Sequence, residues 1–229
     1  MNSLRRSGSA LLILFLLIVA AAIGAGGFAF YGNRMQKQQT QLLAEGFLNF
    51  SKGDLEQAYG HFVNARSTFS SSVDFYRKLA SGTFHTRDEI NEVIVSLSLS
   101  IAHEKFFNLD NDAEWVKKAE KEASHITDPD RRKEITQNIA TANEIVKLLQ
   151  LYKSGDYQKA MKDLLEVENK ASTTDQDFFI FEIRFLIACG KALREPAILN
   201  QARELLFFAT TDAGIENEKT RQLWGLLTR

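Results

Sequence analysis

The sequence predicts an all-α protein in which one transmembrane helix precedes a solenoid of helical hairpins. Three observations carry this prediction: an uncharged stretch over residues 10–31, apolar residues three and four apart through the remainder, and a Gly-Asp dipeptide that twice separates such stretches. The chain has 229 residues, of which 45% are hydrophobic and 25% charged. These proportions are those of an ordinary globular protein and exclude collagen-like and low-complexity classes.

The first predicted element is a membrane-spanning helix over residues 10–31, which follows a short N-terminal tail of residues 1–9. The segment has no charged side chain. A helix of this length reaches about 33 Å, enough to cross a hydrocarbon core of about 30 Å. Arg5 and Arg6 precede the segment, as positive charges do in a signal anchor and in a cleaved signal peptide.

Small residues four apart in the second half of this span allow two interpretations. They are Ala20 with Gly24 and Ala22 with Gly26. Four-residue spacing places each pair on one helix face, where a second membrane helix can pack closely. A signal peptide is the other interpretation, with Ala20 and Ala22 as the small residues of its cleavage site. Because the apolar run continues to Tyr31, beyond such a site, the uncleaved anchor is favoured.

The body of the protein is expected outside the cytoplasm, in a bacterial periplasm, with the anchor in the inner membrane. A long domain behind a short N-terminal tail crosses the membrane largely regardless of its charge. The flanking charges do not decide the orientation, because Arg5 and Arg6 on one side are balanced by Arg34 and Lys37 on the other. A body that faces the cytoplasm is therefore the alternative.

The composition argues against several classes of function. A formal net charge of −1 provides no basic field for nucleic acid. The single cysteine, Cys189, excludes an internal disulfide framework, and its apolar neighbours predict a buried, inert thiol. The four histidines lack the spacing of metal ligands, and no glycine-rich phosphate loop lies beyond the span. Neither an enzyme nor a metal or cofactor is expected.

Residues 35–229 are predicted as one helical repeat domain of about ten helices. Two helix starts are marked by proline: Asp128 precedes Pro129, and Glu195 precedes Pro196. In each pair the acidic residue is predicted as the N-cap and the proline as the first helical residue, where its missing N–H is not needed.

Other stretches bear on the helix assignment. Thr86 and Glu89 have the spacing of a capping box. Residues 95–101 alternate with the period of a strand, yet no neighbouring run offers a partner strand, so a helix is predicted. The aromatic run over residues 178–187 is predicted as core together with residues 207–208; an exposed docking patch is the alternative.

An internal repeat is the most informative feature of the body. Residues 53–58 read GDLEQA, and residues 155–160 read GDYQKA. In each copy the glycine is expected to end one helix in the left-handed conformation, and the aspartate to cap the next. The alanine six residues into the motif is small enough to face the preceding helix closely. The motif therefore predicts a helical hairpin.

These residues resemble the tetratricopeptide repeat family, whose units are 34-residue helix–turn–helix hairpins with small residues at fixed positions. The first copy matches the small and aromatic positions of that family, the second matches less fully, and a third is read without the Gly-Asp turn. The first copy matches at Gly46, Ala58, Phe62 and Ala65. The second matches at Ala160, with Leu148 in place of the first glycine and with Leu164 and Val167 only apolar. The third is read as Gly190, Leu193, Ala202, Leu206 and Ala209, and the final proline of the pattern is absent from all three. The resemblance covers residues 35–229 loosely and implies a curved solenoid.

The resemblance also implies a concave groove lined by the first helix of each pair. In the first unit Leu43, Phe47 and Phe50 are expected to point into this groove. In the second unit the residues at these positions are Ile145, Leu149, Tyr152 and Lys153. For the aliphatic residues of both units, packing in the core is favoured, because apolar stripes are normally buried. Tyr152 and Lys153 are the better groove candidates, because each has a polar end that requires water or a partner.

The function expected from the sequence is protein binding. The chain would be a membrane-anchored scaffold or accessory subunit whose solenoid holds another, membrane-associated protein, and the anchor would raise the local concentration. The alternative is a structural subunit of a membrane complex, held mainly by the transmembrane helix through the faces of Ala20 with Gly24 and Ala22 with Gly26. An oligomer is possible under either interpretation.

Overall fold

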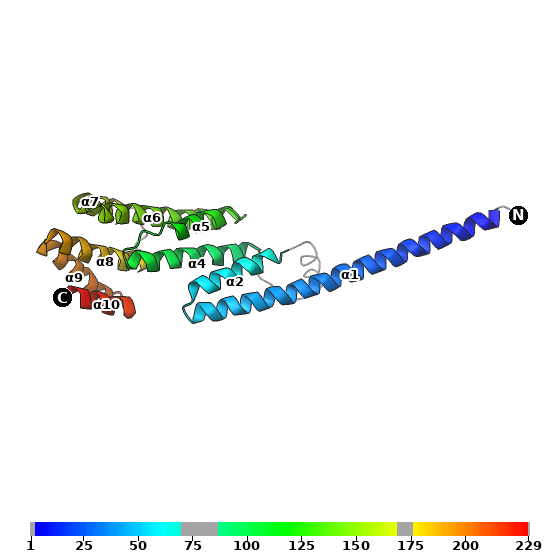
Figure 1. Cartoon of the computed structure of the whole chain (residues 1–229), viewed down its shortest axis with the longest axis horizontal. Helices are drawn as coiled ribbons and strands as arrows, with labels where there is room; N and C mark the ends of the chain where they lie inside the picture. The colour runs from blue at the N-terminus through cyan, green and yellow to red at the C-terminus, as the bar shows by residue number, and fades with distance from the viewer. Residues whose placement is uncertain (1–2, 70–86, 169–175, 229) are drawn as a thin grey trace. The chain divides into compact units, whose positions relative to one another are not determined.

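The computed structural model describes residues 3–69, 87–168 and 176–228, with side chains from residue 24 onward. Every regular element in these ranges is an α-helix, which confirms the all-α class. The helices are α1 (Ser3–Ser51), α2 (Leu55–Ser67), α4 (Arg87–Phe107), α5 (Glu114–Ala123), α6 (Pro129–Lys153), α7 (Tyr157–Glu168), α8 (Gln176–Leu193), α9 (Pro196–Thr211) and α10 (Glu218–Leu227) (Figure 1).

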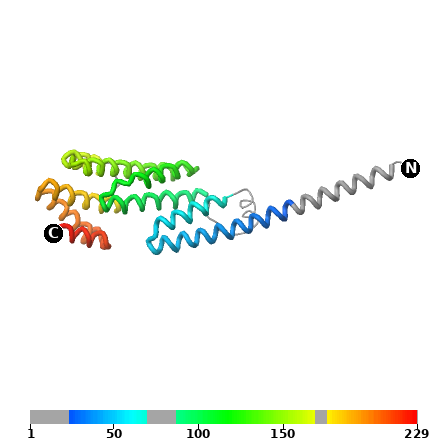
Figure 2. Tube along the Cα trace, in the orientation of Figure 1, coloured from blue at the N-terminus to red at the C-terminus, as the bar shows by residue number. Residues whose placement is uncertain are grey.

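The chain forms two compact units, Met1–Ile90 and Asn91–Arg229, with the boundary inside α4. The first contains the α1–α2 hairpin. The second contains most of α4 and the helices α5 to α10, which follow one another as short antiparallel hairpins (Figure 2). The single repeat domain expected over residues 35–229 stays a prediction.

In the first unit, α2 turns back along the end of α1 (Figure 1). Gly53 has φ +78°, the left-handed conformation that a glycine adopts without steric cost. Asp54 then caps α2, its side chain accepting a hydrogen bond from the backbone N–H of Gln57 at 3.2 Å. The two helices approach closely at Gly46, where a Cβ atom would stand 2.9 Å from the ring of Phe62. Both predicted roles of the Gly-Asp dipeptide are confirmed here.

The second Gly-Asp turn joins α6 to α7 in the same way. Gly155 has φ +82°, and Asp156 accepts a hydrogen bond from the N–H of Lys159 at 3.4 Å. Two further turns share this backbone geometry without glycine: Leu109 has φ +58° and Arg194 φ +56°. In all four, the residue after the left-handed one donates its N–H to the carbonyl five residues earlier, at 2.9–3.0 Å.

The second helix of three hairpins buries its side chains at one common spacing. In α2, α7 and α9 the buried positions fall at i, i+4 and i+7, and the first of the three is always alanine. They are Ala58, Phe62 and Ala65; Ala160, Leu164 and Val167; and Ala202, Leu206 and Ala209. A small first residue lets two helix backbones approach, so the three hairpins pack by one rule.

Helix α4 lies in the core of the second unit. Its predicted helical conformation over residues 95–101 is confirmed. The buried positions of α4 include the adjacent pairs Ile94 with Val95 and Leu97 with Ser98, so they cover more than one narrow stripe of the helix. Helix α4 meets α8 through the Phe106–Phe181 ring pair and α6 through the Arg131–Glu92 ion pair of 2.7 Å. Ser98 is buried, and its hydroxyl donates a hydrogen bond to the Ile94 carbonyl at 2.8 Å, so a serine is tolerated inside this helix.

The proline-marked helix starts are confirmed. Asp128 caps α6 by accepting hydrogen bonds from the N–H groups of Asp130 and Arg131, and Pro129 is the first residue of that helix. Glu195 is the N-cap of α9, before Pro196, but its side chain makes no capping hydrogen bond. The capping box expected at Thr86 falls outside the described residues.

The aromatic prediction is right for α8 and wrong for α9. Residues 178–187 supply much of the core, with Phe181 3% exposed. By contrast, Phe207 and Phe208 are 59% and 50% exposed. The cause is the register of α9, whose buried stripe runs through Ala202, Leu206 and Ala209; other helix positions then face solvent.

The predicted membrane span at residues 10–31 lies within α1, but the side chains of residues 10–23, including those of Ala20 and Ala22, fall outside the described part. Gly24 and Gly26 have no atom within 4 Å of the position of a Cβ atom. Across the portion of the chain that the structure describes, no helix combines the length and the apolar character that a membrane span requires.

The left-handed turn can be tested at Gly53. We expect Gly53→Ala to lower the thermal midpoint of the purified full-length protein, with a loss of about 1 kcal/mol, because an alanine at φ +78° is strained. The matched control is Gly60→Ala, in the interior of α2, where nothing lies within 4 Å of the added methyl group. This control should raise the midpoint, since alanine is the better helix former by up to about 1 kcal/mol. Circular dichroism at increasing temperature measures both; equal shifts would contradict the prediction.

Candidate functional site

Three large apolar side chains near the end of α1 are exposed to solvent. Phe47 is 45% exposed, Leu48 53% and Phe50 52%. We call these three residues the α1 apolar cluster. Two of them, Phe47 and Phe50, were expected from the sequence to line a groove; the third expected residue, Leu43, is half-buried one turn earlier. Leu48 was missed, because the repeat pattern places no partner-facing side chain at its position.

The hairpin fixes the direction in which the cluster faces. Gly46 lies against the Phe62 ring, so the face of α1 around Gly46 is turned toward α2. Phe47 borders this contact and meets Phe62 edge-on, with ring centroids 5.0 Å apart. Phe50, four positions after Gly46, lies on the same side of α1 one turn later, whereas Leu48 lies on the opposite side. The last turn of α1 before Ser51 therefore exposes apolar side chains on more than one side, at the tip of a capped hairpin.

The second set of expected groove residues has partners within the protein. The ammonium group of Lys153, at the end of α6, lies 3.0 Å from Asp110 Oδ1 and donates to Asn111 Oδ1, also at 3.0 Å. Tyr152 is half-buried, with its ring 5.4 Å from that of Tyr157 and 5.8 Å from that of Phe185. These contacts tie α6 to the α4–α5 loop and to α8. The two predicted sets lie in different units.

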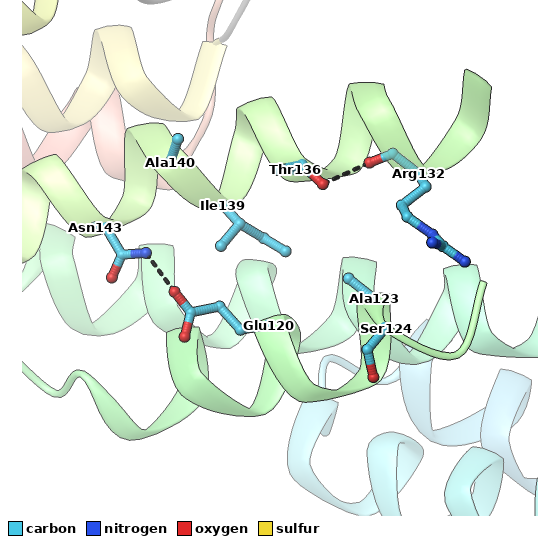
Figure 3. A pocket seen from close by; sticks show the side chains of 8 residues that line it. All are labelled: Glu120, Ala123, Ser124, Arg132, Thr136, Ile139, Ala140 and Asn143. Atoms are coloured by element: carbon cyan, nitrogen blue, oxygen red, sulfur yellow. Dashed lines mark hydrogen bonds between the residues drawn. The ribbon is translucent and has the colours of Figure 1, made fainter. Parts of the chain in front are cut away.

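A groove with a volume of about 500 Å³ lies between α5 and α6 (Figure 3). Ile139 points from α6 toward α5, where the small side chain of Ala123 lines the groove. At one end Asn143 donates to Glu120 at 2.6 Å; at the other, Arg132 donates its guanidinium to the Ile126 carbonyl. The groove's polar groups are thus engaged with one another or with the backbone. Sequence reasoning missed this groove, since its alanines resemble ordinary packing positions.

The second unit contains a pair of facing carboxyl groups. Glu182 on α8 is only 7% exposed, and its carboxyl faces that of Glu168 at the end of α7. Burial and the neighbouring carboxyl raise the pKa of Glu182 to about 8. The Oε1 atom of Glu168 is buried without a hydrogen-bond partner in the described structure. A protonated Glu182 carboxyl can donate a hydrogen bond to the Glu168 carboxyl, which favours the neutral form of Glu182.

Other reactive side chains are held in unreactive settings. Cys189 is buried, as expected, and its burial raises the pKa of the thiol to about 12, which disfavours the reactive thiolate. Asp177 lies 3.4 Å from His103 Nδ1, and this hydrogen bond holds the pKa of Asp177 below its ordinary value. Within the described ranges, no three histidine, cysteine or acidic side chains stand together as a metal site does.

Comparisons with protein-family models, with curated proteins and with solved structures find no match to this chain. The resemblance to tetratricopeptide repeats therefore stays a prediction from the sequence.

The carboxyl pair predicts a pH dependence of stability. The pKa of Glu182 is raised on folding, so its stabilising contribution is complete below the unfolded-state pKa of about 4.5 and is lost as the pH rises through about 8. We expect the thermal midpoint of the full-length protein to fall by several degrees between pH 5 and pH 9. Glu182→Gln should reduce this fall, because glutamine stays neutral.

Differential scanning calorimetry in matched buffers measures this effect. Glu166→Gln, at an exposed position of α7, is the control and should keep the wild-type pH profile. Identical profiles for Glu182→Gln and the wild type would mean that Glu182 does not titrate in this range.

Proposed function

We propose that this chain is a membrane-anchored scaffold or accessory subunit that binds another protein through its helical hairpins. The observation that carries the proposal is the α1 apolar cluster, in which Phe47, Leu48 and Phe50 are each about half exposed. Single exposed apolar residues are ordinary, but three large ones on the last turn of one helix are typical of a contact with another protein.

The chemistry of the cluster fits a protein partner. Phenylalanine and leucine provide a large contact area and no hydrogen-bonding group, so they favour a partner with an apolar surface of its own. Phenylalanine also loses little conformational freedom on contact, which favours binding. Lys52 and the polar residues of the turn border the cluster and supply the polar rim that such contacts have.

The remaining parts of the proposal come from the sequence. Residues 10–31 form the anchor, which confines the protein to the inner membrane and raises the local concentration of a membrane-associated partner. The body, a tetratricopeptide-like solenoid, faces the periplasm. The common i, i+4, i+7 burial in α2, α7 and α9 supports the repeated hairpin on which such a solenoid is built.

Crosslinking in native membranes tests this function. We expect the double substitution Leu48→Ser with Phe50→Ser to reduce the yield of the crosslinked partner at least about tenfold. The reason is that each substitution removes an apolar contact that is buried in the complex and contributes about 1.5–3 kcal/mol. The control is Leu165→Ser on α7, which removes a leucine of equal exposure, 52%, from the other unit.

Mass spectrometry of the crosslinked bands gives the yields, and circular dichroism confirms that both variants keep their helical content. An undiminished yield for the double variant would overturn the α1 apolar cluster as the binding surface.

The alternative function is a structural subunit of a membrane complex held by α1 itself. It is favoured by Gly24 and Gly26, against which no described residue packs within 4 Å of a Cβ position, and by Phe30, which is 72% exposed. We expect Gly24→Leu with Gly26→Leu to leave the crosslinked partner unchanged if the scaffold proposal is right. Native gel electrophoresis of solubilised membranes measures this, and complete loss of the complex would favour the alternative.

A further inference from the structure

Arg184, on α8, is a partly buried cation without a partner in the described structure. Its side chain makes neither a hydrogen bond nor an ion pair with any described residue. Burial holds the pKa of its guanidinium below the ordinary value. The ionisable group that interacts with it electrostatically is the hydroxyl of Tyr152, which is neutral at physiological pH. A partly buried charge with no opposite charge beside it costs stability even where the group still reaches solvent, so its retention calls for an explanation.

Arg184 lines a solvent-open cavity with a volume of about 450 Å³ in the second unit. Arg221 on α10 contributes a second guanidinium, and Asn108 and Gln222 contribute amides. The rest of the wall is apolar, provided by Phe107 and Leu226. The cavity thus joins hydrogen-bond donors to a hydrophobic wall, and its volume is in the range of ligand-binding sites.

The charges that face the cavity do not cancel. Its one acidic group, Glu218, lies 3.8 Å from Arg221, and both side chains are at least 70% exposed, so this pair is loose and well screened. Nearby, Lys191 donates its ammonium to the Leu226 carbonyl at 2.6 Å, which adds positive charge to the rim. Arg184 is therefore left uncompensated in a cavity of net positive charge.

We propose that this cavity binds the carboxylate of an aspartate or glutamate side chain of the partner protein, held between Arg184 and Arg221. The planar guanidinium of arginine matches a carboxylate with two parallel hydrogen bonds. Phe107 and Leu226 then contact an apolar residue beside that acid. The inference rests on the proposed scaffold function and names a second, charged contact for the same partner.

Two features favour an acidic side chain over a free small acid. The cavity is open to solvent, as is suitable for a side chain that enters from another protein, whereas free metabolites are usually enclosed. The cavity is also lined by Gly225, which has no side chain, and no described residue lies within 4 Å of the position that its Cβ atom would take. A partner backbone can therefore approach closely there.

Nuclear magnetic resonance of the full-length, detergent-solubilised protein tests the proposal. With ¹⁵N-arginine labelling, the Nε–Hε signal of Arg184 is identified by its absence in Arg184→Gln. The probes are an N-acetylated, C-amidated hexapeptide Ala-Leu-Glu-Glu-Leu-Ala, its counterpart with glutamine in place of glutamate, and free glutarate. We expect the acidic peptide to shift the Arg184 signal saturably, and the glutamine peptide to bind at least about tenfold more weakly.

Glutarate should also bind more weakly than the acidic peptide, because it lacks the apolar flanks. Arg221→Gln should weaken peptide binding several-fold. The control is Arg203→Gln on α9, whose guanidinium donates to Asn200 at 2.8 Å and lies outside the cavity; it should bind as the wild type does. Equal binding of the two peptides, or glutarate binding as tightly as the acidic peptide, would overturn the proposal.

A second measurement separates a binding role from a structural one. Because Arg184 is an uncompensated charge in the free protein, Arg184→Met should keep or raise the thermal midpoint while it abolishes the response to the acidic peptide. A lowered midpoint would make Arg184 a structural residue and overturn the inference. If the Arg184 variants crosslink the partner normally but the Leu48 and Phe50 variants do not, this inference fails and the scaffold function stands.

Discussion

The close approach of two helices within each hairpin is the constraint on which the rest of this structure depends. A left-handed residue ends the first helix, and the next N–H returns to the carbonyl five residues earlier. The second helix then places an alanine against the first, at Ala58, Ala160 or Ala202. Only a small side chain there lets the backbones meet, so the turn and the alanine act together. Longer apolar residues four and seven positions later fill the remaining space.

Buried aromatic rings join the hairpins of the second unit into one core. Phe181 lies between its neighbours Phe178 and Phe185 on α8 and also meets Phe106 on α4. Helix α4 also contacts α6, through the ion pair of Glu92 with Arg131. The same helix α8 carries two ionisable groups within three residues, Glu182 and Arg184, which burial affects in opposite ways. Burial and the Glu168 carboxyl raise the pKa of Glu182, whereas burial lowers the pKa of Arg184.

These features define two surfaces of different chemistry. The α1 apolar cluster has no charged member, and under the proposed function its apolar area would contribute affinity without directional specificity. The Arg184 cavity places guanidinium and amide donors beside a small apolar wall, and under the further proposal these donors would contribute specificity for a carboxylate. Specific protein contacts combine both kinds of interaction, with apolar groups at the centre and charges that exclude wrong partners.

The sequence by itself determined the local structure of this protein: the all-α class, the turns at Gly53 and Gly155, and the caps at Asp54 and Asp128. These follow from backbone conformations and hydrogen bonds that span only a few residues. The turns at Leu109 and Arg194 have no glycine to indicate a left-handed residue, so only the structure revealed their conformation.

Burial was decided only by the tertiary structure. Apolar spacing does not say which aromatic residues are covered, so Phe207 and Phe208 were expected inside and lie outside. Nor did spacing indicate that Lys153 pairs with Asp110, that Glu182 meets Glu168, or that Arg184 has no partner among the described residues. Each of these outcomes depends on neighbours supplied by distant segments, because the burial and the charge state of a side chain are set by what packs around it.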